Sequence, residues 1–279
     1  MIFNTATPID TATTAQYAGE ILQEVQRDSL FVINHSGGKD SQAMYAVITS
    51  LVPADQIVVV HADLRVADWA YLKSHIRENT DHDLAVVAAK DAAGNDKDFL
   101  TMVEARHEKL AGSASPWPSP SVRQCTSDLK RTPIESFIKA ELKRRGLDRA
   151  INCMGIRAEE SANRAKLATW KINKRFNTKT TNRQVIDFLP IFDLTEDEVW
   201  KIIEMSGQER HFAYDLGMSR LSCCFCIMGS KADLKVAAKA NPELYKRYVE
   251  LEKKTGFTMM MNEKTLEENT GIVVDQAVA

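Results

Sequence analysis

The chain has 279 residues, 44% of them hydrophobic, with 12 Gly, 8 Pro and a formal net charge of −2. This composition is typical of one large α/β domain, or of a domain with an appendage. The near-neutral charge gives no sign of a nucleic-acid binder, and no apolar run approaches the length needed to span a membrane.

The N-terminus and the cysteines indicate the compartment. Residues 1–10 lack the basic and apolar pattern of a signal peptide. The cysteines number five, and three of them, Cys223, Cys224 and Cys226, lie within four residues. That spacing is poor for a disulfide framework in a chain of this size. We therefore expect a reducing cytoplasm, with the cysteines kept for metal binding or chemistry.

The N-terminal half alternates between helical and strand patterns. The pattern predicts helices over residues 11–28, from Gln42 onward and over Ala67–Asn79, and strands over Phe31–Ile33, Ile57–Val60 and Leu84–Ala88. This order predicts a parallel twisted sheet with helices on both faces, a Rossmann-like α/β fold. Ligands of such sheets bind at the carboxyl ends of the strands.

The C-terminal half continues the pattern and then becomes helical. We expect strands at Ala150–Met154 and Val185–Leu189, a loop over Gly112–Pro120, and loosely held residues at the C-terminal end. Capping signals predict helix starts at Thr132, Thr195, Ser230 and Asn241, with ends at Gly146, Gly207 and Gly256. The predicted organisation is an N-terminal helix (1–27), a nucleotide-binding α/β domain (28–210), a cysteine-containing helical region (211–262) and a tail (263–279).

A glycine loop follows the first predicted strand. The order strand, glycine turn, helix aims backbone N–H groups and the positive end of a helix dipole at one point, which favours an anion. Two adjacent glycines allow close approach of a ligand, and a lysine adds a mobile charge. It is not a Walker loop, because Ile33 stands where that motif needs glycine. The loop residues are Ser36, Gly37, Gly38, Lys39, Asp40 and Ser41.

This Ser-Gly-Gly-Lys-Asp-Ser loop resembles the pyrophosphate loop of the ATP pyrophosphatase superfamily, the PP-loop or adenine nucleotide alpha hydrolase-like proteins. The superfamily includes PAPS reductases, ATP sulfurylase small subunits, tRNA thiolases and a component of DNA phosphorothioation systems. The resemblance implies ATP with Mg²⁺ as the ligand and the PP-loop ATPase fold. It also implies catalytic roles for Lys39 and Asp40.

A second segment narrows the resemblance. Gly155-Ile156-Arg157 and the following residues to Arg164 resemble the Gly-x-Arg-x-x-x-Ser-x-x-Arg segment of PAPS reductase-like proteins. There the basic residues meet nucleotide phosphates, so we expect Gly155, Arg157 and Arg164 to bind the nucleotide. Asp63, at the end of the second predicted strand, is expected to hold the ribose or Mg²⁺. The strand-end histidines His35 and His61 are expected to pack rather than to act as bases.

Four cysteines are predicted to form a metal or redox centre. Cys223 and Cys226 make a Cys-x-x-Cys pair that can bring two thiolates to one metal, with Cys224 between them. Cys125 lies just before a basic helix start, in a segment that also resembles the PAPS reductase branch. Family resemblance favours a 4Fe–4S cluster with three or four of these ligands, and Zn²⁺ is the alternative. Cys153, inside a predicted strand, is expected to be a core residue.

A basic stretch follows Arg164. Residues 164–183 contain seven basic residues and no acidic one, among them Lys171, Lys174 and Arg175. Such a stretch suits a loop that closes over an anionic substrate, or stacking on a nucleic-acid strand because Trp170 lies within it. A solvated basic helix face is the alternative.

Together these motifs predict an adenine-nucleotide enzyme with sulfur chemistry. The leading hypothesis is ATP-dependent adenylation, with release of pyrophosphate, coupled to sulfur transfer onto a nucleic acid or nucleotide. The first alternative is a sulfonucleotide (APS or PAPS) reductase, although no cysteine follows Cys226 in these 279 residues. The second is a non-catalytic nucleotide- or DNA-binding subunit. The expected partners are the adenine nucleotide, a nucleic acid, a sulfur donor or partner subunit, and a second copy of the chain.

Overall fold

The computed structural model describes residues 12–176 and 182–274. Its mostly parallel sheet has six strands in the order β3-β2-β1-β4-β6-β5. The strands are β1 (Leu30–Asn34), β2 (Ile57–Asp63), β3 (Leu84–Ala88), β4 (Arg149–Met154), β5 (Trp170–Ile172) and β6 (Gln184–Phe188). The helices are α1 (Ala12–Gln26), α2 (Lys39–Thr49), α3 (Leu72–Glu78), α4 (Phe99–Leu110), α5 (Gln124–Thr126), α6 (Thr132–Arg145), α7 (Glu196–Met205), α8 (Lys231–Ala240), α9 (Pro242–Thr255) and α10 (Leu266–Thr270).

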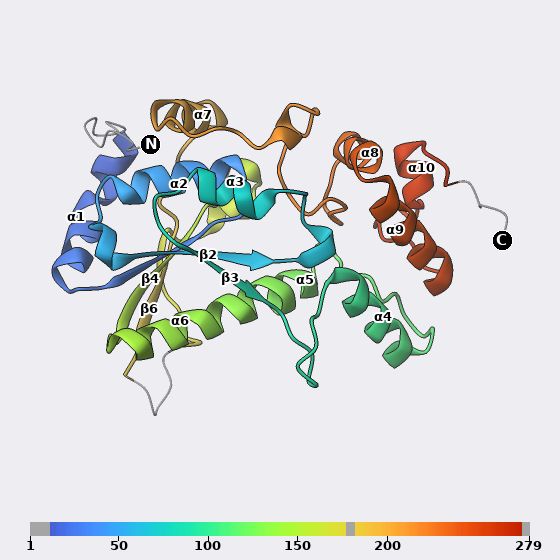
Figure 1. The fold of residues 1–279 in the computed structure, drawn as a ribbon, viewed down its shortest axis with the longest axis horizontal. Helices are drawn as coiled ribbons and strands as arrows, with labels where there is room; N and C mark the ends of the chain where they lie inside the picture. Colours follow the sequence, from blue (N-terminus) through green and yellow to red (C-terminus); the bar gives the residue numbers. More distant parts are fainter. Residues whose placement is uncertain (1–11, 177–181, 275–279) are drawn as a thin grey trace. The chain divides into compact units, whose positions relative to one another are not determined.

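The central strands run parallel. β1 pairs with β2 on one side and with β4 on the other, β4 pairs with β6, and β5 adds an antiparallel edge. Because side chains alternate along a strand, the two faces of the sheet are buried separately. Phe31 and Ile33 join the core formed with α1, α2 and α7, whereas Leu30 and Val32 are buried outside it. Figure 1 shows α2 and α7 on one side of the strands and α6 on the other, so the predicted fold class is confirmed.

The chain divides into two compact units. The first comprises the residues up to His61, Tyr71–Val86 and Ile134–His211, which include most of the sheet. The second comprises Ala62–Ala70, Val87–Pro133 and the residues from Phe212 onward. The predicted domain boundaries at 27/28, 210/211 and 262/263 stay a prediction. No helix in the described part of the chain is long and apolar enough to cross a membrane.

Two predicted helices differ from the structure. Instead of one helix over Ala67–Asn79, a short 3-10 turn at Arg65–Ala67 precedes α3. Tyr71 interrupts the run because its φ of 59° is left-handed. The predicted cap at Thr132 is also wrong, because helical turns already begin at Gln124. The Thr132 hydroxyl instead donates to the Ser127 carbonyl at 2.9 Å.

Other predictions of helix ends hold. Thr195 makes the predicted capping box with Glu198, and Ser230 caps α8 by accepting from Asp233 N–H. Asn241 makes no side-chain cap, although α9 begins at Pro242 and ends at Gly256 as expected. The predicted loose C-terminal end is wrong for the residues up to 274, because α10 has its own capping box and its neighbours are hydrogen-bonded.

A buried ion pair fixes α1 to the sheet. Glu24, only 3% exposed, accepts from Arg149 Nε at 2.5 Å and Nη2 at 2.7 Å, and from the Ser29 hydroxyl at 2.7 Å. Burial alone would raise the pKa of Glu24, but the bonds from Arg149 and Ser29 outweigh it and lower the pKa. The ion pair therefore stabilises the fold above the ordinary carboxyl pKa, and this stabilisation is lost as the pH falls through the lowered pKa.

Replacing Glu24 should destabilise the protein. Glu24→Gln leaves the Arg149 charge without its partner and should lower the free energy of unfolding by about 2–4 kcal/mol. The loss should be smaller than for a fully buried ion pair, because Arg149 keeps partial contact with water. Urea unfolding at pH 7 measures the change. Glu20→Gln, at an exposed position of the same helix, is the matched control and should change stability by less than about 0.5 kcal/mol. Equal effects of the two substitutions would contradict the assignment.

Candidate nucleotide site

The glycine loop turns between β1 and α2 under tight steric limits. Gly37 has a φ of 78°, a backbone angle that favours glycine, and a Cβ there would lie 2.3 Å from Leu72 Cδ1, so that the Leu72 side chain would have to shift. Gly38 is the N-cap of α2 and offers no side-chain cap to the helix. The N-terminal end of α2 and its dipole are thus presented without a capping side chain, as an anion site requires.

Hydrogen bonds within the loop hold this turn. The Ser41 hydroxyl donates to the Gly38 carbonyl at 2.8 Å and accepts from the Ser36 N–H at 3.2 Å. Ser36 is exposed, whereas Ser41 is buried. Ser41 therefore supports the loop from inside, and Ser36 is the serine that faces solvent.

Neutral histidines lie behind the loop. His35 Nδ1 accepts from the Gly37 N–H at 3.1 Å, and burial lowers the pKa of His75 as well. Burial, and then the charges of His61 and His75, lower the pKa of His35 to about 3. The loop thus depends on an uncharged imidazole as its acceptor. This agrees with the expectation that His35 packs rather than acts as a base.

The turn after β4 meets the start of α2. Asn34 and Met154, the last residues of β1 and β4, are paired in register. A Cβ on Gly155 would lie 2.9 Å from the Asp40 carbonyl oxygen, which leaves no room for a side chain. A polar ladder fixes this edge: Asn34 donates to Asn152 Oδ1 at 2.8 Å, and Asn152 donates to Asp187 Oδ1 at 2.7 Å.

Arg157 joins three chain segments beside the loop. Its side chain is 3% exposed, and its Nε donates to Asp40 Oδ1 at 2.6 Å. It also pairs with Glu159, and with Glu196 at 3.8 Å. Burial would lower the pKa of Arg157, but the bonds and charges of Asp40 and Glu159 outweigh it and raise the pKa. Arg157 is therefore a fixed cation next to the first turn of α2.

Lys39 points into the same network. Its side chain is 4% exposed and its Nζ lies 3.6 Å from Glu196 Oε1. Glu159 also accepts from the Glu196 N–H at 2.9 Å, which ties the first turn of α7 to the turn after β4. The sequence analysis did not single out Glu159 or Glu196. Two sequence features could have drawn attention to them. Glu159 lies inside the motif that contains Arg157, and the capping box at Thr195 places Glu196 in the first turn of a helix.

The remaining predicted basic residues lie farther along the chain. Arg164 pairs with Glu160, four residues before it, within the first unit. Lys171, Lys174 and Arg175 are exposed, and Arg175 also bonds Glu135 at 2.7 Å. Lys171 lies on β5 rather than on the helix face considered as an alternative. Residues 177–181 of the basic stretch, including Lys179, lie outside the described residues.

The predicted cysteines and Asp63 belong to the second unit. Asp63 is buried and accepts from the Arg65 N–H at 2.9 Å. Cys125, Cys223 and Cys226 are each half-buried, and all three act on the pKa of Lys130. Cys224 is buried, and its N–H donates to the Ala67 carbonyl at 2.9 Å.

The arrangement of the four predicted cysteines bears on metal binding. Among the described residues, no three His, Cys, Asp or Glu side chains are arranged to hold one metal ion. A single zinc ion needs its donors within reach of one point, whereas each thiolate of a 4Fe–4S cluster binds a different iron. The ligand set therefore stays a prediction. Cys153 is fully buried in β4, as expected for a core residue.

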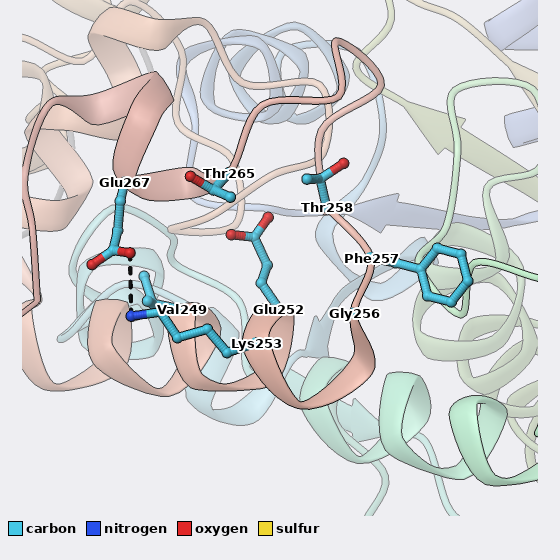
Figure 2. Close-up of a pocket in the computed structure, with 8 residues that line it drawn as sticks. All are labelled: Val249, Glu252, Lys253, Gly256, Phe257, Thr258, Thr265 and Glu267. Atoms are coloured by element: carbon cyan, nitrogen blue, oxygen red, sulfur yellow. Dashed lines mark ion pairs between the residues drawn. The ribbon is translucent and has the colours of Figure 1, made fainter. Parts of the chain in front are cut away.

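A cavity lies elsewhere in the second unit. It has a volume of about 220 Å³ and is lined by α9, the loop after it and the start of α10 (Figure 2). Glu252 accepts from the Met259 N–H at 2.7 Å and the Leu266 N–H at 2.8 Å, while Lys253 pairs with Glu267 at 3.2 Å. These bonds fasten the loop to the helix. No predicted site residue lines the cavity, so we assign it no role in nucleotide binding.

Gly155 offers a test of the loop geometry. Gly155→Ala should push its methyl group against the Asp40 carbonyl and cost about 1–3 kcal/mol, as overpacking does. Urea unfolding measures the loss. Gly19→Ala, where a Cβ meets nothing within 4 Å, should be neutral or stabilising because the position is helical. A Gly155→Ala protein as stable as the wild type would contradict the close approach.

The buried, neutral His35 should make the stability of the folded protein sensitive to acid. The folded pKa of His35, about 3, lies below its unfolded value near 6.5. The unfolded state therefore binds the extra proton, and stability is lost at up to about 1.4 kcal/mol per pH unit as the pH falls below 6.5. His35→Asn, which keeps an acceptor for Gly37, should show a shallower loss in urea unfolding between pH 6.5 and 4.5. An NMR titration that showed His35 protonating near pH 6.5 would contradict the prediction.

Comparisons with known proteins find several relatives of this chain. An uncharacterized protein of Methanocaldococcus jannaschii is 23% identical over 236 residues, which cover 84% of this chain and 51% of the relative. The chain thus spans about half the length of that curated relative. A solved PAPS reductase of Candida auris, in a phosphate complex, has a TM-score of 0.47 at 13% identity and covers 78% of this chain and 91% of its own.

Another solved structure is an FMN adenylyltransferase of Candida glabrata with FMN and the ATP analog AMPCPP. It has a TM-score of 0.42 at 12% identity, with 78% of this chain and 68% of its own covered. The model of the phosphoadenosine phosphosulfate reductase domain matches residues 31–228, which include the glycine loop, the Arg157 turn and the cysteine pair. The chain therefore belongs to the phosphoadenosine phosphosulfate reductase domain family.

Proposed function

We propose that the protein binds ATP on the glycine loop and cleaves it between the α- and β-phosphates, transferring AMP to a substrate. The observation that carries this proposal is the N-terminal end of α2. Gly37 and Gly38 give it no side-chain cap, and two buried cations, Lys39 and Arg157, stand beside it. A helix N-terminus with adjacent cations suits a chain of phosphates.

The charges around the loop favour a nucleotide that brings its own cation. Two cations, Lys39 and Arg157, are matched by three carboxylates, those of Asp40, Glu159 and Glu196. An anion that binds without a metal cation would be repelled by this excess of one negative charge. Mg²⁺ usually takes one or two protein carboxylates together with phosphate oxygens. The balance therefore supports Mg-ATP over a sulfonucleotide, with Asp40 and Glu159 as candidate ligands.

The reaction follows from these groups. A substrate oxygen attacks the α-phosphorus, a new P–O bond forms, and the bond to the β-phosphate oxygen breaks, so that pyrophosphate leaves. Lys39 and the N–H groups at the start of α2 are expected to stabilise the charge that develops on the leaving pyrophosphate. Arg157 keeps Asp40 oriented toward the loop. When bound, Mg²⁺ neutralises phosphate charge.

The second half of the proposal is sulfur transfer. A reduced sulfur nucleophile would displace AMP from the adenylated substrate, forming a carbon–sulfur bond as the carbon–oxygen bond breaks. The sulfur atom comes from an external sulfide donor, because a cysteine thiol that attacked the carbon itself would leave the substrate bound to the protein. Cys125, Cys223 and Cys226 are the candidates to receive that donor. Lys171 and Lys174, exposed on and after β5, are the candidates to bind a nucleic-acid acceptor through its phosphates.

The family favours a second candidate, reduction of a sulfonucleotide to sulfite. In that reaction a thiol attacks the sulfur of the phosphosulfate, the nucleotide leaves, and a second thiol releases sulfite as a disulfide forms. Two partly exposed thiols of the second unit would satisfy this balance. The two candidates differ in their products, pyrophosphate against sulfite.

Lys39 provides the decisive variant. Lys39→Ala should lower pyrophosphate release from γ-labelled Mg-ATP by about 100-fold or more, the range for loss of one stabilising group in a transition state. The assay contains anaerobic protein, sulfide, and mixed RNA and DNA as acceptors. Lys109→Ala, on α4, is the control and should match the wild type. Wild-type pyrophosphate release by the Lys39→Ala protein would refute the site, and sulfite release from PAPS with a dithiol would support the reductase.

A further inference from the structure

The cavity beside α9 contains a buried carboxylate that no cation balances. Glu252 is 5% exposed and lines this cavity. Figure 2 shows its carboxylate pointing between Thr258 and Thr265, toward the middle of the lining residues. Among the described residues, no lysine, arginine or histidine forms an ion pair with it. This is unusual, because buried charges in proteins are normally paired.

Two backbone N–H groups anchor the Glu252 carboxylate. The N–H of Met259 donates to Oε1 at 2.7 Å, and the N–H of Leu266 donates to Oε2 at 2.8 Å. An ionised carboxylate has about four acceptor positions, so each oxygen keeps the capacity for a further bond. Both donors are neutral and leave the negative charge in place. The fold therefore orients this carboxylate without neutralising it.

The charged residues around the cavity add to the negative charge. Among the described lining residues Lys253 is the one cation, and it pairs with Glu267 at 3.2 Å. Two lining carboxylates and one ammonium leave one negative charge in excess. Burial, and then the charges of Glu267 and Glu268, raise the pKa of Glu252, although the two backbone bonds oppose the shift. A positively charged ligand would offset this excess.

The size and the walls of the cavity limit what that ligand can be. Val249 and the Phe257 side chain contribute apolar surface to the lining. A cavity of about 150 Å³ is known to hold benzene, so the volume of about 220 Å³ suits a ligand of about six to ten heavy atoms, much smaller than a nucleotide. No three His, Cys, Asp or Glu side chains of the described chain are arranged to hold a metal ion. The chemistry that fits is an organic cation with a short apolar body.

We propose that this cavity binds a small alkylamine. The ammonium group donates to the unused acceptor positions of Glu252, and the alkyl chain packs against Val249 and Phe257. Because the N–H groups of Met259 and Leu266 already orient the carboxylate, binding requires little rearrangement. The cavity belongs to the second unit alone, so the proposal goes beyond the nucleotide chemistry and does not rest on it.

Binding should also stabilise the connection between α9 and α10. Glu252 lies on α9, and its two bonds reach Met259 in the following loop and Leu266 at the start of α10. An ammonium beside the carboxylate removes part of the cost of burying its charge. A ligand that binds only the folded protein raises its thermal midpoint. Alkylamine binding is therefore expected to raise the midpoint.

The test uses n-pentylamine, with 1-pentanol as the uncharged control of the same chain length. Binding to the full chain is followed at pH 8 through the amide NMR signals of Met259 and Leu266 and through the thermal midpoint. Pentylamine should shift both amide signals saturably and raise the midpoint. Pentanol should bind about tenfold or more weakly, because its hydroxyl forms no charge-assisted bond with Glu252.

Two variants locate the binding site. Glu252→Gln should weaken pentylamine binding by about tenfold or more, because it removes the charge. Glu250→Gln, at an exposed position of the same helix, is the matched control and should bind like the wild type. Since glutamine offers only one oxygen to the two backbone N–H groups, a second variant leaves Glu252 in place. Thr258→Phe should fill the cavity with its ring and abolish binding.

Three results would overturn the proposal. The first is a wild-type protein whose amide signals do not shift saturably with pentylamine. The second is equal affinity for pentylamine and pentanol, which would make the cavity an apolar pocket without a preference for a cation. The third is wild-type affinity in both Glu252→Gln and Thr258→Phe. None of these measurements involves ATP or Lys39, so a failure here and a failure of the ATP proposal are distinguishable.

Discussion

The arrangement of the candidate site depends on the Arg157 guanidinium. It is nearly inaccessible to water, yet it bonds Asp40 on α2, Glu159 on its own turn and Glu196 on α7. A buried cation is tolerated only where carboxylates surround it, and it then fixes those carboxylates in turn. One side chain thereby holds three chain segments at the carboxyl end of the sheet.

This constraint explains the positions of neighbouring groups. Gly155 must lack a side chain because the turn that carries Arg157 lies against the Asp40 backbone. Lys39 shares Glu196 with Arg157, so both cations are oriented before any ligand arrives. On the other side of the loop a neutral His35 accepts from Gly37 without adding charge. The loop is therefore preorganised by charge pairs on one side and by uncharged hydrogen bonds on the other.

The second unit poses a different problem, that of buried polar groups without ordinary partners. The Tyr248 hydroxyl is buried and has no hydrogen-bond partner among the described residues. Tyr245, on the same helix, is fully satisfied.

The sequence by itself determined the fold class, the family and the position of the glycine loop. Local signals suffice for these, because strand periodicity, adjacent glycines and capping boxes act within a few residues. It failed where distant residues decide the outcome. Thr132 has the local pattern of a cap but lies inside a longer helical run, and Tyr71 interrupts a helix that periodicity alone would continue.

Only the tertiary structure decided how the charged residues combine. The sequence indicated that Arg157 and Lys39 are cations near a phosphate site, but it gave no sign that Glu159 and Glu196 neutralise them. It grouped Cys223, Cys224 and Cys226 by spacing and added Cys125 by resemblance, whereas the fold buries Cys224 and leaves the other three half-buried. Ion pairs and burial depend on contacts between segments that lie far apart in the chain, and no local pattern records those contacts.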